Sequence, residues 1–324
     1  MHRRDFARLA GATLAAGFLP DSALAQAKGW PERAVKVILP YAPGGATDAI
    51  GRPWADKLTQ AFGQQFVVEN RGGASGMIGV EAGAKSAPDG YTLLLTPNAP
   101  LTVLPNLRKT PYDPIKSFDP VARVGDTING FVIHPTVGVK TFHEMIAYAR
   151  KNPGKLTYGS SGNGTSTHLR LEMLKHKMGV DILHIPYRGG ADTLNDVLPG
   201  TVHMMNEPVS LPHAKAGKLI LLNINGPSRH PDFPDVPTLT ELGVTGADVP
   251  VWFSIFVPAG TPKEIIAMLN AKVQEIARTD EMKAKLIAVN AVAPLQSPED
   301  MAKHLGEDTK AMAELIKAAN VKIE

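Results

Sequence analysis

Short apolar runs separated by helical patterns cover most of the chain. The runs have the length and the β-branched or aromatic content of buried strands. Strands that alternate with helices in this way predict parallel α/β sheets, and a chain of this length predicts two of them. The expected strands are 34–39, 66–69, 91–95, 131–134, 182–185, 219–224 and 252–257.

Three of the expected helices carry start signals. Thr141 and Glu144 have the spacing of a capping box, and Thr261 and Glu264 repeat that spacing with a proline at the first helical position. Ser297 opens the last helix in the same way. These signals indicate where the connections end and the helices begin.

One strand-and-turn sequence occurs twice, as VILPYAPGGATD at 37–48 and as LHIPYRGGAD at 183–192. Each copy is an apolar strand that ends at Pro-Tyr, followed by paired glycines and a short acidic residue, Asp48 or Asp192. The glycines allow a sharp turn, and the helix that follows begins with free N–H groups that favour a carboxylate or a phosphate. We therefore expect the copies to form two walls of a ligand cleft, with each aspartate either facing the cleft or only capping its helix.

A third turn, GSSGNGTSTH at 159–168, is rich in small polar donors. It lacks the lysine of a phosphate-binding P-loop, and Asn163 stands where a nucleophile elbow around Ser161 requires glycine. Two interpretations remain: a nest of N–H and hydroxyl donors for a neutral or anionic ligand, or a plain flexible loop. His168 either contacts the ligand or caps or packs within the turn.

Composition narrows the functional classes. The chain has 324 residues, of which 44% are hydrophobic and 20% charged, and this is enough for two lobes with sizeable cores. The net charge is +3 and the basic residues are scattered, so we expect no nucleic-acid partner. Without cysteine there is no disulfide framework and no thiolate chemistry. The histidines lack the spacing of a zinc site, and we expect neither a metal nor a cofactor.

The N-terminus has the pattern of a cleaved export signal, assigned to residues 1–25. Basic residues precede an apolar run from Leu9 to Leu19, and Ala23-Leu24-Ala25 is a small-x-small cleavage site. The run has about 11 residues, whereas a membrane-spanning helix needs roughly 20. Arg3-Arg4 resembles a twin-arginine signal. The sequence therefore predicts a soluble periplasmic protein.

Several motifs, in this order along the mature chain, resemble the Bug family of solute receptors. These are the extracytoplasmic binding proteins of tripartite tricarboxylate transporters. The motifs are WPER at 30–33, PYAPGGATD at 40–48, VENRGGA at 68–74, PDGYTL at 88–93, IPYRGG at 185–190 and DVPT at 235–238.

The resemblance implies an α/β fold of two lobes, the periplasmic binding protein fold of the second type, with the ligand cleft between the lobes. Lobe one would comprise 26–130 and 253–324, and lobe two would comprise 131–252. It also implies that neutral donors of two facing turns and ordered waters hold a ligand carboxylate. The ligand-binding positions carried over are Tyr41, Gly44, Gly45, Asp48, Thr96, Asn98, Ser160, Ser161, Thr165, Ser166, His168, Arg188, Gly189 and Asp192.

Three features depart from the family pattern. Pro53 falls inside the first helix, which predicts a kink or a late start. Asp192 stands where proline is common, and an ionised aspartate facing the cleft would favour amino acids or monocarboxylates. Asn206-Glu207-Pro208 is unusual at the mouth of the second lobe, and we expect Asn206 to contact the far end of the ligand.

These observations predict a monomeric periplasmic receptor that captures a small organic carboxylate by lobe closure and delivers it to membrane transporter subunits. It would perform no chemistry. Two alternatives remain: a secreted α/β hydrolase that uses Ser161 and His168, and a ligand sensor for a signalling partner.

Overall fold

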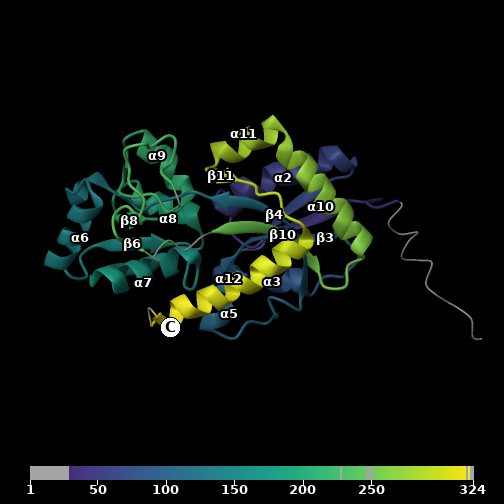
Figure 1. Cartoon of the computed structure of the whole chain (residues 1–324), viewed down its shortest axis with the longest axis horizontal. Coiled ribbons are helices and arrows are strands. Elements are labelled where there is room, and N and C mark those ends of the chain that lie inside the picture. Colours follow the sequence, from purple (N-terminus) through teal and green to yellow (C-terminus); the bar gives the residue numbers. More distant parts are fainter. Residues whose placement is uncertain (1–28, 227, 246–247, 249–250, 319, 322–324) are drawn as a thin grey trace, which may run out of the picture. The chain divides into compact units, whose positions relative to one another are not determined.

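The computed structural model describes residues 29–226, 228–245, 248, 251–318 and 320–321. The predicted export signal at 1–25 lies outside the described residues. The described residues from 31 onward form one compact unit that contains two β-sheets, with helices packed around each (Figure 1).

The first sheet has six strands in the order β11-β4-β10-β3-β1-β2. Toward one edge, β1 pairs in parallel with β2 and β3, whereas β10 is antiparallel to both β3 and β4 and β11 is antiparallel to β4. The strands are β1 (Val35–Leu39), β2 (Phe66–Asn70), β3 (Thr92–Pro97), β4 (Phe118–Thr127), β10 (Trp252–Pro258) and β11 (Ala291–Val292).

The second sheet has five strands in the order β7-β6-β8-β5-β9. Here β6 is parallel to β7 and β8, and β5 is antiparallel to β8 and β9. The strands are β5 (Val132–Ile133), β6 (Thr157–Ser160), β7 (Leu183–Pro186), β8 (Met204–Met205) and β9 (Ile220–Leu221).

The helices divide between the sheets in sequence blocks. The first and last blocks are α2 (Ala46–Phe62), α3 (Met77–Ala84), α4 (Ala99–Thr102), α5 (Leu104–Leu107), α10 (Lys263–Arg278), α11 (Asp280–Ala288) and α12 (Pro298–Ala318). The middle block is α6 (Phe142–Lys151), α7 (Ser166–Met178), α8 (Gly190–Val197) and α9 (Leu211–Lys215). Short 3₁₀ turns occur at Ala74–Gly76, Pro135–Val137 and Pro208–Ser210.

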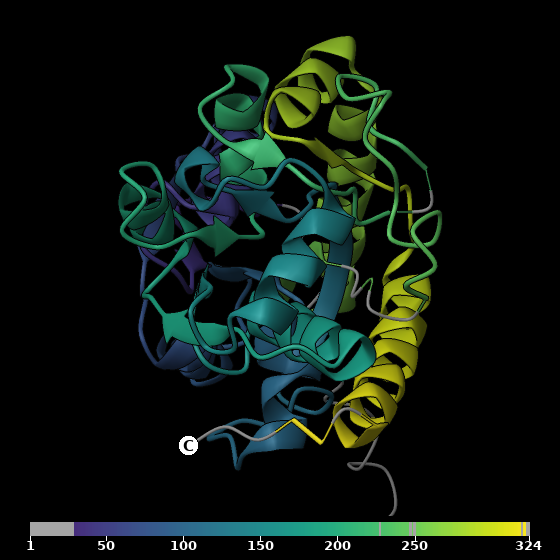
Figure 2. The ribbon, with the colours of Figure 1, turned by 90° about the vertical axis from the view of Figure 1, so that its left-hand side faces the viewer.

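The chain passes from the first sheet to the second between β4 and β5, and returns with β10. The last helix, α12, then makes a further connection, because Met312 and Ile316 near its C-terminal end are buried in the same core cluster as Phe142 of α6 and Tyr158 of β6. Figures 1 and 2 both show α12 extending from the first-sheet elements toward α7. The lobe boundaries at 130/131 and 252/253 remain a prediction.

The apolar runs predicted four of the six strands of the first sheet and three of the five strands of the second. Seven of the strands named above overlap the predicted ranges, but β9 has only two residues. The pattern missed β4, β6, β8 and β11, and in β4 Pro120 and Gly125 interrupt the apolar alternation. In the structure β4 accommodates these residues because its pairing with β10 shifts register at two points.

Two of the predicted helix starts are confirmed and one is wrong. Thr141 accepts a hydrogen bond from the Glu144 amide (3.2 Å), and Ser297 accepts one from the Asp300 amide (3.0 Å). The hydroxyl of Thr261 instead donates to the Pro258 carbonyl (2.7 Å), and α10 begins without a side-chain cap. Helix α2 starts at Ala46 and continues through Pro53, so its start is not late.

Candidate functional site

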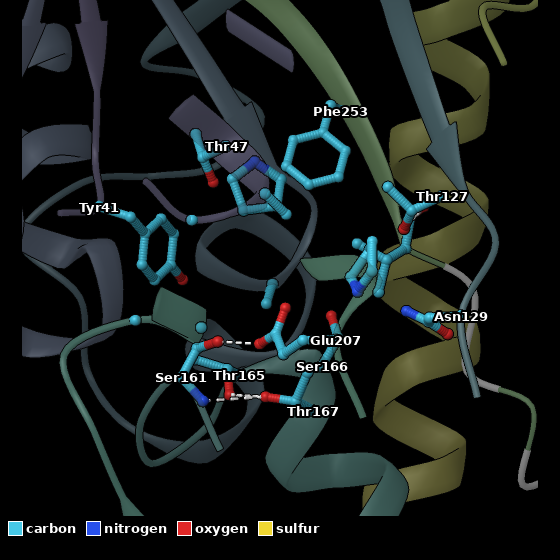
Figure 3. A pocket seen from close by; sticks show the side chains of 18 of the residues that line it. Tyr41, Thr47, Thr127, Asn129, Ser161, Thr165, Ser166, Thr167, Glu207 and Phe253 are labelled. Carbon is cyan, nitrogen blue, oxygen red and sulfur yellow. Dashed lines mark hydrogen bonds between the residues drawn. The ribbon is translucent and has the colours of Figure 1, made fainter. Parts of the chain in front are cut away.

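A pocket lies where strand ends and turns of the two sheets meet. The first sheet contributes the ends of β1, β3 and β4 and the start of β10, and the second contributes the turns after β6, β7 and β8. Figure 3 shows Tyr41, Thr47 and Phe253 on one side and Ser161, Thr165 and Thr167 on the other. The lining residues are Tyr41, Ala42, Gly45, Ala46, Thr47, Pro97, Ala99, Thr127, Asn129, Ser161, Thr165, Ser166, Thr167, Gly189, Gly190, Glu207, Pro208, Val251 and Phe253.

The two copies of the repeated sequence contact each other at this pocket. We call residues 40–48 the first turn and residues 186–192 the second turn. A Cβ placed on Gly44 would lie 3.6 Å from the Ala191 Cβ, and one placed on Gly45 would lie 3.8 Å from the Gly190 nitrogen. Both helices that follow have a glycine as their N-cap residue, Gly45 for α2 and Gly189 for α8, and neither glycine offers a side-chain cap. The N–H groups of both first turns are therefore available for an anion.

Asp48 stabilises the first turn through hydrogen bonds. Its Oδ2 accepts hydrogen bonds from the Gly44 amide (3.1 Å) and from Arg52 Nε (2.9 Å), and its Oδ1 accepts one from Asn70 Nδ2 (3.0 Å). Burial raises the pKa of this carboxyl, but the hydrogen bonds from Arg52, Gly44 and Asn70 together lower it further than burial raises it. Asp48 is thus an ionised support for the turn, and it is absent from the pocket lining.

The polar loop, residues 159–168, is held by its own hydroxyl groups. Thr165 caps α7 by accepting from the His168 amide (3.3 Å), and Thr167 Oγ1 accepts from the Ser161 amide (3.1 Å). Ser160 Oγ accepts from the Gly162 amide (3.1 Å). These bonds give the loop a defined shape, which agrees better with a nest of donors than with a plain flexible loop.

Two neutral histidines support the polar loop from behind. His184 Nε2 lies 2.6 Å from Ser160 Oγ, and His168 Nδ1 accepts from the Gly164 amide (3.0 Å). The two rings stack with their centroids 4.1 Å apart. Burial lowers the pKa of His168 to about 4, and burial together with the neighbouring His168 lowers the pKa of His184 to about 3.

One acidic side chain, Glu207, lines the pocket, and it is only 6% exposed. Its Oε1 accepts a hydrogen bond from Ser161 Oγ, and the Thr167 hydroxyl also lies within hydrogen-bonding reach of the carboxyl group. Burial raises the pKa of Glu207, and the bonds from Ser161 and Thr167 and the charge of Arg170 only partly oppose this.

Asn129 is a polar side chain without a partner for its Oδ1 atom among the described residues, and it is 1% exposed. It lies in the connection between β4 and β5 and lines the pocket next to Thr127 (Figure 3). Buried polar atoms nearly always have a hydrogen-bond partner, so an unpartnered one at a pocket suggests a bound water or ligand.

Asn98 joins the two sheets below the pocket. Its Oδ1 accepts from Ser166 Oγ of the polar loop (3.2 Å), and its Nδ2 donates to Asp308 Oδ2 of α12 (3.3 Å). Trp252 Nε1 donates to the same Asp308 oxygen (3.1 Å). A direct hydrogen bond therefore spans from the end of β3 to the start of α7.

Comparison with known proteins identifies the family. A model of the tripartite tricarboxylate transporter family receptor matches residues 50–321. BugT from Bordetella pertussis is 33% identical over 299 residues, which cover 91% of this chain and 92% of that protein. The chain belongs to the Bug family of tripartite tricarboxylate transporter receptors.

Solved structures agree with this family assignment. The periplasmic binding protein BugD superimposes with a TM-score of 0.87 at 31% identity, over 91% of this chain and all of that one. Rpa4515 of R. palustris with adipate gives 0.87 at 34% identity (90% and 99% covered), and MatC of Rhodopseudomonas palustris with bound malate gives 0.84 at 28% identity (89% and 100%). The fold of this Bug-family chain is the two-lobe periplasmic binding protein fold.

The structure brings some of the predicted site residues to the pocket and places others behind it. Those that line it are Tyr41, Gly45, Ser161, Thr165, Ser166 and Gly189. Those absent from its lining but in the adjoining turns, strands and helices are Gly44, Asp48, Thr96, Asn98, Ser160, His168 and Asn206.

Arg188 and Asp192 line a different, open depression together with Pro186, Tyr187, Asn195 and Asp196. Asn206 is fully buried, and its Oδ1 accepts from Arg170 Nη1 (3.0 Å). Binding by any of these residues stays a prediction.

Sequence reasoning missed several lining residues. Thr47 and Thr167 lie inside the two motifs that were singled out, so their hydroxyl groups were a usable signal. Glu207 stood next to Asn206, which was chosen instead. Asn129 and Phe253 lie where the chain crosses between the sheets, and no local pattern marks such positions.

Two further searches concern other classes of site. Within the described ranges, no group of three or more His, Cys, Asp and Glu side chains could hold a metal ion. No helix in the part of the chain that the structure describes has the length and apolar character needed to cross a membrane.

Proposed function

We propose that this chain is a periplasmic receptor that captures a small organic carboxylate in the pocket between its two sheets and delivers it to a tripartite tricarboxylate transporter. The observation that carries the proposal is the meeting of two helix N-termini, at Gly45 and Gly189, without side-chain caps. Two sets of backbone amides with positive helix dipoles can hold a carboxylate without a basic side chain.

The family supports the same ligand class. Members of known structure carry adipate or malate, both of which are carboxylates. The lining residues of this pocket include Ser161, Thr165, Ser166 and Thr167, whose hydroxyl groups can donate to a carboxylate or to the waters around it. We further propose that the protein reaches the periplasm through the predicted signal at 1–25, and that it acts as a monomer.

The geometry around the polar loop argues against the hydrolase alternative. Ser161 donates to Glu207, whereas His168 accepts from a backbone amide, so these two residues do not form the required nucleophile and base pair. Ser160 does contact His184, but Ser160 is fully buried and absent from the pocket lining. We therefore propose binding without chemistry.

The test is a binding screen on the purified mature protein, first unfolded and refolded to remove any copurified compound. Adipate, malate, aromatic acids, hydroxy acids and amino acids are compared by thermal shift and calorimetry, because a ligand that binds only the native state raises its melting temperature. We expect a shift with at least one class, and mass spectrometry should recover the compound unchanged. No shift with any carboxylate, or conversion of one, would overturn the proposal.

A matched pair of variants places the ligand. Gly45 has an extended backbone and room for a Cβ, so Gly45→Val should fold, while its side chain enters the junction with Gly190 and abolishes the ligand-induced shift. Gly306→Val in α12 is the control, since no atom lies within 4 Å of a Cβ there. An unchanged shift in Gly45→Val would place the ligand elsewhere.

A further inference from the structure

The wall of the pocket, as formed by the described residues, carries an acidic side chain and no basic one. Its lining contains one acidic residue, Glu207, and no Lys, Arg or His. Arg170, a buried arginine on α7, is not among the lining residues, and its Nη1 donates to Asn206 (3.0 Å). The ligand would therefore meet a carboxyl group directly, with any balancing positive charge of the protein held behind the wall.

The carboxyl group of Glu207 is fixed in direction. Oε1 accepts the hydroxyl hydrogen of Ser161, and the side chain rests against Gly190, where a Cβ would lie 3.1 Å from Cδ and 3.2 Å from Oε2. Figure 3 shows the second oxygen turned away from Ser161, toward the space between Tyr41 and Phe253. Ser161 acts as the donor in this pair, which leaves Glu207 as an acceptor toward the pocket.

A dicarboxylate is a poor match for this arrangement. One carboxylate of the ligand would occupy the amides of the two turns, and the second would lie in the same dry pocket as Glu207, where two carboxylates either repel each other or one of them must take up a proton. A ligand with an ammonium group at its other end brings a positive charge into the pocket itself and donates to the oxygen of Glu207 that Ser161 does not occupy.

We propose, building on the proposed function, that Glu207 determines specificity and selects a small carboxylate that also carries an ammonium group over a dicarboxylate of the same length. Asp192, which the sequence suggested for this role, lines the outer depression instead. Burial raises the pKa of Glu207 in the empty pocket, and a bound ammonium group favours the ionised form.

Calorimetry with matched probes tests the proposal in the wild-type protein. The pairs are 4-aminobutyrate against succinate and 6-aminohexanoate against adipate, which differ in the group at one end. Because the position of an ammonium group along the ligand is not fixed by the geometry, L-glutamate and L-aspartate are measured beside glutarate and succinate. We expect at least one amino-carboxylate to bind tenfold or more tightly than its matched dicarboxylate.

A substitution of Glu207 tests whether this residue causes the preference for amino-carboxylates. Glu207→Gln keeps the shape and an acceptor for Ser161 but removes the charge, so the preference should fall at least tenfold, with the dicarboxylate gaining affinity. Glu264→Gln, the same change at an exposed position of α10, is the control. If Glu207→Gln does not fold, Glu207→Asp should weaken amino-carboxylate binding by withdrawing the carboxylate from the ligand.

The outcomes separate this inference from the proposed function. Tight binding in the wild type of a dicarboxylate that lacks an ammonium group, or equal changes for both probes of a pair in Glu207→Gln, would overturn the role of Glu207. The proposed receptor function would nevertheless be supported if Gly45→Val abolished that binding. Failure of every probe and every carboxylate in the wider screen would overturn both proposals.

Discussion

The first turn and the polar loop face the same pocket but are stabilised in opposite ways. The first turn depends on an ionised group, since Asp48 binds Gly44, Arg52 and Asn70. The polar loop depends on neutral groups, since hydroxyls and two uncharged imidazoles hold its backbone. The comparison shows that the ionised Asp48 and the two neutral histidines all act from behind the lining, whereas Glu207 is the acidic side chain that reaches the pocket itself. It also predicts that the two sides respond differently to pH.

The largest effect should come from acid acting on the polar loop. The pKa values of His168 and His184 are lowered to about 4 and about 3, whereas in the unfolded chain they are about 6.5. Below pH 6.5 the two histidines therefore become protonated in the unfolded state while they remain neutral in the folded state. The contribution of the two neutral histidines to the free energy of unfolding is fully present above pH 6.5. It is lost as the pH falls toward their folded-state pKa values of about 4 and about 3.

Between pH 7 and pH 4.5 we expect the free energy of unfolding to fall by roughly 3–5 kcal/mol from this pair, with the share of His184 reduced because it is partly exposed. Urea unfolding at the two pH values measures the loss. The double variant His168→Gln, His184→Asn should be less stable at pH 7 but show a flatter pH dependence. A variant with the wild-type pH dependence would contradict the assignment.

The first turn should be insensitive over the same pH range, and its own test is removal of the carboxylate. The pKa of Asp48 is lowered, so its stabilisation is present above the unfolded value near 4 and is lost only as the pH falls below it. Asp48→Ala leaves the Gly44 amide without its acceptor and removes one of the two acceptors of Asn70 Nδ2, which also donates to the Tyr41 carbonyl (3.0 Å). We expect a loss of about 2 kcal/mol in the free energy of unfolding at pH 7, measured with urea.

Asp48→Asn is the control for charge, because it keeps one acceptor for this network. It should lose less stability than Asp48→Ala. A loss below about 0.5 kcal/mol in Asp48→Ala would mean that water replaces the carboxylate, and that the first turn does not depend on it.

A smaller effect separates the two glycines of the first turn. Gly44 has φ of +81°, a conformation that costs other residues about 1 kcal/mol, and Gly44→Ala should lose about that much stability. Gly45 has φ of −84°, which any residue adopts, so Gly45→Ala should leave the melting temperature nearly unchanged. Equal melting temperatures in the two variants would show that the strain at Gly44 is relieved by movement of the turn.

The sequence predicted the meeting of the two turns because a strand end, paired glycines and a helix start are local features with fixed geometry. It could not predict the roles of the side chains that follow. Asp48 and Asp192 occupy equivalent places in the two copies, and their partners decide what they do. Those partners, such as Asn70 for Asp48, are distant in sequence, as are the crossover residues Asn129 and Phe253 that complete the pocket.

The smallest expected effect completes the comparison of the two copies. Asp192 is half-buried in the first turn of α8 and lines the outer depression, and no hydrogen bond or ion pair of its side chain occurs among the described contacts comparable to those of Asp48. Asp192→Ala should therefore change the free energy of unfolding by less than about 0.5 kcal/mol, through the helix dipole alone. Ligand affinity should change by less than about twofold, measured by calorimetry beside Asp48→Ala. A large loss of affinity would mean that Asp192 turns into the pocket when the ligand binds, and that the two copies are functionally more alike than their contacts indicate.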